Sequence, residues 1–91
     1  MTDLNQRTEE ISDLVAKLTP ISDMAILLGV TEIELREALD DPTSPAAYAY
    51  KAAKARVALQ LRERDIELAS AGSPTAAENV GYYFRQMLQD E

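Results

Sequence analysis

The sequence predicts an all-α fold with about five helices, and three observations lead to this prediction. Apolar residues recur every three or four positions, whereas no segment alternates polar and apolar residues with the period of two that is typical of a strand. Residues with a β-branched side chain do not cluster. A hydroxyl residue precedes proline at Thr19-Pro20, Ser44-Pro45 and Ser73-Pro74, a pair typical of an N-cap followed by the first helical residue.

The first helix is expected over about residues 3–18 and the second over residues 20–28. In the first, apolar side chains share one face, and most of the acidic side chains lie on the other. These apolar positions are Leu4, Ile11, Leu14, Val15 and Leu18. In the second helix they are Ile21, Met24, Ala25 and Leu28. We expect the second helix to end at Gly29, because glycine readily adopts the positive φ that terminates many helices.

Thr31 and Glu34 have the spacing of a capping box, which predicts a third helix over about residues 32–40, ending before Asp41-Pro42. A fourth, long helix is expected over residues 45–71, ended by Gly72. The fifth is expected from residue 74 to about residue 89. Its apolar stripe consists of Val80, Phe84, Met87 and Leu88.

The second and third helices match the pattern of a helix-turn-helix. This motif needs a small residue where its helices cross, a turn residue that tolerates positive φ, and apolar residues that lock the helices together. Ala25 stands at the small position and Gly29 at the turn. The locking positions are Met24, Leu28, Val30 and Leu35. We therefore predict one compact domain of 91 residues, in which residues 1–42 form the helix-turn-helix unit.

Residues 43–91, the long helix and the C-terminal helix, are predicted to be an oligomerisation region. Two apolar stripes run along the long helix, and a helix of about 40 Å is longer than so small a domain covers. One stripe consists of Tyr48, Ala52, Ala55, Leu59, Ile66 and Ala69, and the other of Tyr50, Val57, Leu61 and Leu68. We expect a homo-oligomer. The alternative is that the first and fifth helices of the same chain cover both stripes.

Charge is unevenly distributed, and this bears on DNA binding. The net charge is −7, and residues 1–44 alone carry all of it. In a helix-turn-helix, outward residues at the start of the second helix meet base edges. The predicted DNA-binding residues are Thr31, Glu32 and Arg36 in that helix, with Lys51, Lys54 and Arg56 of the long helix on phosphates. Glu32, Glu34 and Glu37 repel phosphate. The alternative for the basic residues of the long helix is that each is an ordinary solvated side chain or pairs with an acidic residue of its own or a neighbouring subunit.

Composition argues against an enzyme. The chain has no Cys and no His, which excludes disulfides, imidazole acid–base chemistry and the usual ligand sets for zinc, copper or haem. It has no glycine-rich phosphate loop, so we expect no catalytic residue, metal or cofactor. The longest apolar run, residues 24–30, is far shorter than a membrane span of roughly 20 residues, and the start lacks a signal-peptide pattern. A cytoplasmic protein with no membrane partner is expected.

The region from about residue 19 to residue 88 resembles the small terminase subunits of tailed phages and related short phage helix-turn-helix proteins. The resemblance is carried by Ala25 and Gly29 in the turn unit, and in the rest of the chain by Ala49-Tyr50, residues 53–55, Leu61-Arg62, Leu68-Ala69, residues 72–74 and Ala76. It implies a DNA-recognising unit on a ring-forming helical core, which marks viral DNA for packaging in the bacterial host cell and recruits a large terminase subunit. Residues 31–39 would then be the recognition helix, with Arg36 as the base contact, and residues 86–91 the docking segment for the large subunit if this chain has one.

Two other functions stay open at this point. One is a protein–protein assembly module, in which a degenerate helix-turn-helix meets its partners through its acidic face. The other is a small phage or prophage transcriptional regulator, which would form a dimer on half-sites about one helical turn apart. Glu32, Glu34 and Glu37 depart from what the resemblance implies for a recognition helix, because carboxylates repel phosphates.

Overall fold

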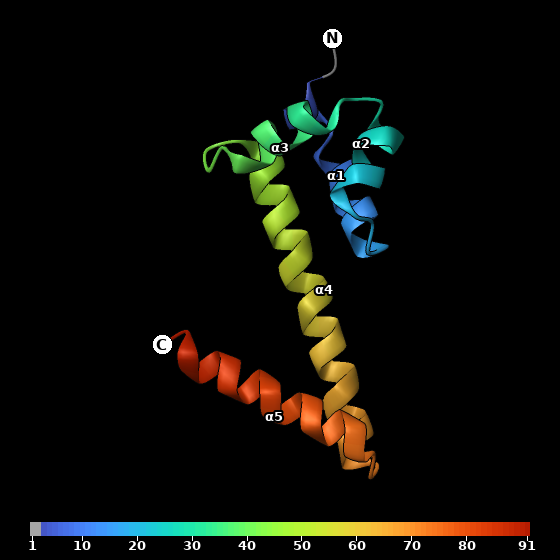
Figure 1. Cartoon of the computed structure of the whole chain (residues 1–91), viewed down its shortest axis with the longest axis vertical. Helices are drawn as coiled ribbons and strands as arrows, with labels where there is room; N and C mark the ends of the chain where they lie inside the picture. The colour runs from blue at the N-terminus through green and yellow to red at the C-terminus, as the bar shows by residue number, and fades with distance from the viewer. Residues whose placement is uncertain (1–2) are drawn as a thin grey trace. The chain divides into compact units, whose positions relative to one another are not determined.

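The computed structural model describes residues 3–91 and confirms the all-α fold (Figure 1). Within that range no strand is present. A short 3-10 helix, η1, precedes five α-helices. Their bounds are Leu4–Gln6 for η1, Thr8–Ala16 for α1, Ile21–Leu28 for α2, Glu32–Asp40 for α3, Pro45–Ser70 for α4 and Pro74–Gln89 for α5. None of the helices in residues 3–91 combines the length and apolar character that crossing a membrane requires.

Two compact units make up the chain, one ending at Val57 and the other running from Ala58 to Glu91. The boundary lies inside α4, whereas the sequence placed the change of region near residue 42. The reason is that the first part of α4 belongs to the N-terminal core. Ala46 and Ala53 are buried there, and Tyr50 and Val57 pack against the same cluster.

The expected first helix is in fact two shorter ones. Asp3 caps η1 by accepting a hydrogen bond from the Asn5 amide at 3.0 Å. The helical path then breaks at Arg7, whose φ is −116° and ψ 34°. At the other end α1 stops at Ala16, and Leu18 takes a left-handed conformation with φ 60°. The predicted core position of Leu18 was wrong, because this turn leaves its side chain 66% exposed.

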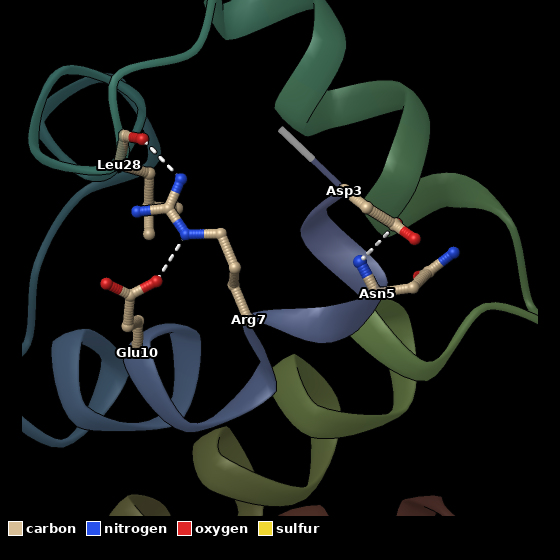
Figure 2. A network of polar contacts seen from close by, with 5 residues as sticks. All are labelled: Asp3, Asn5, Arg7, Glu10 and Leu28. Carbon is tan, nitrogen blue, oxygen red and sulfur yellow. Dashed lines mark hydrogen bonds and ion pairs between the residues drawn. The ribbon is translucent and has the colours of Figure 1, made fainter. Parts of the chain in front are cut away.

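Arg7 ties the start of α1 to the end of α2 (Figure 2). Its guanidinium donates a 2.6 Å hydrogen bond to the carbonyl of Leu28 and a second bond to the carboxylate of Glu10. Leu28 is the last residue of α2, where carbonyls lack a partner within the helix and a positive charge is favourable. The bond from Arg7 holds the pKa of Glu10 below the usual range of a glutamate.

This lowered pKa predicts how the stability of the first unit depends on pH. A carboxyl whose pKa is lower in the folded state stabilises the fold fully above its ordinary pKa of 4.5, and this contribution is lost as the pH falls through the lowered value. We therefore expect Glu10→Gln to melt at a lower temperature than the wild type at neutral pH, with the difference vanishing in acid. The matched control is Glu9→Gln, on the same helix, which removes one carboxylate without touching the bond to Arg7 and should melt close to the wild type at neutral pH. A constant difference between Glu10→Gln and the wild type would contradict the prediction.

Three of the four predicted helix starts are confirmed. The hydroxyls of Thr31, Ser44 and Ser73 each accept a bond from the amide three residues later, at 3.1, 2.9 and 3.3 Å respectively. The predicted cap at Thr19 was wrong. The N-cap of α2 is Pro20, whose carbonyl accepts the first helical bond from Met24 at 2.8 Å.

The core of the first unit is small and dense. Ile11, Met24 and Leu35 are its largest fully buried side chains, one each from α1, α2 and α3. The alanines of α4 close it, because a methyl group lets the helix backbone approach these side chains closely. Ser44 joins α3 to α4, since its hydroxyl also donates to the carbonyl of Ala38 at 2.7 Å.

The second unit consists of the later part of α4 and all of α5, and it has very little core. Ala76 is its one buried residue. The two helices are joined by polar contacts, in which the Tyr83 hydroxyl donates to Asp65 at 2.7 Å and the Arg62 guanidinium lies 5.7 Å from the centre of the Tyr83 ring. The bond to Asp65 and the partial burial of the hydroxyl raise the pKa of Tyr83, against the opposing effect of Arg62.

Candidate nucleic-acid interface

The α2–α3 pair has the packing of a helix-turn-helix. Gly29 occupies the turn with φ 74°, and the amide of Val30 bonds back to the carbonyl of Ala25 at 3.0 Å. Ala25 is 2% exposed, so the small side chain stands where it was predicted. The locking residues Met24, Leu28 and Leu35 are buried, and Val30 is partly buried against them. A side chain at Gly29 would meet no neighbouring atom, so the need for glycine lies in its backbone conformation.

The three residues expected to meet bases lie at the start of α3 but are bonded to other residues of that segment. Thr31 caps the helix, and its hydroxyl also donates to the Glu34 carboxylate at 3.1 Å. The guanidinium of Arg36 donates twice to one carboxylate oxygen of Glu32, at 2.9 and 3.2 Å. Arg36 would have to leave Glu32 before it could bind a guanine edge.

The electrostatics around α3 are unfavourable for phosphate. This helix carries four acidic residues against Arg36 alone. A hollow of about 360 Å³ beside it, between η1 and α3, adds further carboxylates. The hollow is lined by Asp3, Leu4, Asn5, Glu34, Glu37, Ala38, Asp41 and Ser44. A phosphate at this surface would meet negative charge at distances where repulsion is strong.

The three predicted phosphate contacts are all exposed on α4, but they do not share one face. Lys51 and Arg56 are five residues apart, which places them about 140° apart around the helix axis. The ammonium of Lys54 lies 5.1 Å from the centre of the Tyr50 ring, a cation–π contact that leaves the charge exposed. In the described part of the chain none of the three bases forms an ion pair.

Arg56 lines an open groove of about 510 Å³ between α1 and α4. On the α1 side the groove is lined by Thr8, Glu9, Ser12 and Asp13. Two of these residues are acidic, so the charge of Arg56 is partly offset by its surroundings. Of the predicted phosphate contacts, Lys51 and Lys54 are therefore the better placed to attract DNA.

Sequence reasoning missed an exposed apolar group on the helix-turn-helix. Ile26 and Leu27 of α2 and Ile33 of α3 are 76%, 64% and 71% exposed. For Ile33 a signal was available in the sequence. Leu35 and Leu39 are four residues apart and share the core face, whereas Ile33 lies two residues before Leu35 and so points to the opposite side.

No family model, no curated protein and no solved structure matches this chain. The helix-turn-helix is therefore identified by its turn and its packing alone, and any function for it has to be argued from its surface.

Proposed function

We propose that this protein is a non-catalytic DNA-binding adaptor that acts in several copies, in the manner of the phage small terminase subunits that it resembles. The observation that carries the proposal is the α2–α3 pair, with Ala25 buried at the crossing, Gly29 at the turn and Leu35 locking the helices. That arrangement presents the start of α3 outwards, as a recognition helix requires. A cytoplasmic location in a bacterial host and a large terminase partner belong to the same proposal.

Several copies are needed because one copy offers DNA little attraction. Lys51 and Lys54 are exposed and free of ion pairs among the described residues, but the acidic residues of α3 oppose them. When modules are linked in one assembly, the second and later contacts become intramolecular, and weak contacts add up to firm binding. The arginine at position 36 then contributes selectivity by exchanging Glu32 for a guanine, and phosphate attraction comes from α4.

A second candidate is a protein-binding assembly module, and one observation favours it. Glu32 already neutralises Arg36, while Ile33 beside them is 71% exposed. An exposed apolar side chain that Glu32 and Glu34 flank in the sequence suits a protein partner with basic residues better than it suits a nucleic acid. A transcriptional regulator would share the DNA-binding surface of the first proposal and differ in being a dimer.

Titrating fluorescently labelled random-sequence duplex DNA at several salt concentrations, with anisotropy as the readout, tests the proposal. We expect the logarithm of the binding constant to fall linearly with the logarithm of the salt concentration. Replacing Lys51, Lys54 and Arg56 together with glutamine should reduce the magnitude of that slope by about 2.7 if all three bases contact phosphates. A slope that does not change would remove these three residues from the interface.

The matched control removes bases elsewhere, by replacing Lys17 and Arg85 with glutamine. Both are exposed and lie outside the proposed interface. Their removal should leave most of the slope in place. An equal loss per replaced base in the two variants would mean that net charge alone governs binding. No binding of the wild type even at low salt would replace the DNA adaptor with the protein-binding module.

A further inference from the structure

An apolar groove lies between α4 and α5 in the second unit, with a volume of about 660 Å³. Its apolar lining consists of Ile66, Val80, Tyr83, Phe84 and Met87, and we call this surface the hairpin groove. Arg62, Gln86 and Asp90 are its polar lining. Ile66, Phe84 and Met87 each remain more than half exposed. The groove is thus an apolar hollow that α4 and α5 of this unit leave unfilled.

A second apolar surface lies on another side of α4. Leu61 and Leu68 are seven residues apart, so they stand one above the other on one side of the helix, and we call this pair the leucine ridge. Leu61 precedes Ile66 by five residues, which places the ridge about 140° around the helix from the groove. Both leucines are exposed, Leu61 by 52% and Leu68 by 38%.

The second unit exposes a large apolar area for its size. Eight of its large hydrophobic side chains retain between 38% and 56% of their surface. They are Leu59, Leu61, Ile66, Leu68, Tyr82, Phe84, Met87 and Leu88. With about 200 Å² for each such side chain when fully exposed, this leaves on the order of 800 Å² on one copy. Because a copy in a repeating contact uses one side for each neighbour, each contact covers roughly half of this area on each partner, the size of a small interface between proteins.

We propose that the leucine ridge of one copy fills the hairpin groove of a second copy. A row of leucines on a helix is convex and the groove is concave, so one chain carries both halves of a single contact. One pair of charges fits as well, because Arg64 lies on the helix between the two leucines and Asp90 lines the groove, where the other charged residue, Arg62, is held at the Tyr83 ring. A foreign partner that covered one surface would leave the other exposed, whereas a second copy of this chain accounts for both.

Such a contact is heterologous, since it joins two different surfaces, and it repeats from copy to copy until a ring closes or a filament forms. The inference deepens the multi-copy part of the proposed function by naming the surfaces that join the copies. It does not depend on DNA binding, so each can fail without the other.

The test measures the molar mass of the full chain without DNA, by size-exclusion chromatography with light scattering. We expect the wild type to be larger than a dimer. Phe84→Glu places a charge in the apolar groove, and Leu61→Glu places one on the ridge. Each variant alone should therefore be monomeric. Mixed in equal amounts, the two variants should form a heterodimer that does not grow, because one supplies an intact ridge and the other an intact groove. Leu27→Glu, an exposed leucine of α2, is the control and should assemble like the wild type.

Each other outcome overturns the inference. A wild type that stays monomeric at high micromolar concentration shows that a second copy is not the occupant, and two variants that fail to pair show that groove and ridge do not meet. Far-UV circular dichroism establishes that the variants keep their helices. If one does not, Met87→Glu replaces the groove variant and Leu68→Glu the ridge variant. Assembly without DNA binding would leave this inference standing and reject the DNA adaptor.

Discussion

Replacing Leu35 with alanine is expected to lower the free energy of unfolding of the first unit by about 2–5 kcal/mol. Leu35 is fully buried, and it belongs to a core that it shares with Ile11 and Met24. Its removal deletes buried methylene and methyl groups and leaves a cavity that this dense core fills only in part. Urea unfolding followed by circular dichroism measures the loss, and hydrogen exchange locates it in residues up to Val57.

The control lies on the same helix. Ile33 is 71% exposed, so Ile33→Ala should change the free energy of unfolding by no more than about 0.5 kcal/mol. Similar losses in the two variants would mean that α3 does not pack as described. If Leu35→Ala reduced the protection of amides against hydrogen exchange as much in the second unit as in the first, the two units would unfold together.

Replacing Ala25 with leucine is expected to destabilise the first unit by about 1–3 kcal/mol and to disrupt the helix-turn-helix. Ala25 is 2% exposed, and its carbonyl accepts the bond from Val30 that closes the turn. The larger side chain has no room, so α3 must shift relative to α2. If the chain binds DNA as proposed, binding should fall along with stability, because the start of α3 would no longer be presented in the same orientation.

Ala55→Leu is the matched substitution at an exposed position of α4. It adds the same side-chain volume where space is open, and the expected change in the free energy of unfolding lies within about 0.5 kcal/mol. Equal and small effects of the two substitutions would contradict the close helix crossing at Ala25. Chemical unfolding monitored by circular dichroism measures both variants under the same conditions.

The elements of the fold could be predicted because their ends are encoded locally. Thr31, Ser44 and Ser73 each cap a helix through their own hydroxyl, and Gly29 supplies a positive φ at the end of α2. The error at Thr19 arose because Leu18 adopts a left-handed conformation, which a non-glycine residue takes only when its surroundings impose it. The split at Arg7 depends on tertiary contacts for a similar reason, since Asn5 bonds the amide of Ala46 in a helix far along the chain.

The candidate site was less predictable than the fold. Residue types and spacing placed Thr31, Glu32 and Arg36 at the exposed start of α3, but which rotamers bring Arg36 onto Glu32 is a question of geometry. The periodicity of the sequence also could not show that the apolar residues of the second unit are exposed. A stripe such as Val80, Phe84 and Met87 looks the same in a sequence whether its partner is another helix of the chain or another molecule.

If copies of the chain associate as proposed, the sparse core of the second unit makes its folding sensitive to protein concentration. A pair of helices that buries only Ala76 completely gains little free energy from closing by itself, and short helices in water are marginally stable without packing. If neighbouring copies supply the missing packing, then mass action determines how much of this unit is ordered. A dilute chain would keep a firm N-terminal unit and a fraying C-terminal one, and only at high abundance would both be rigid. The chain would in this way sense its own expression level.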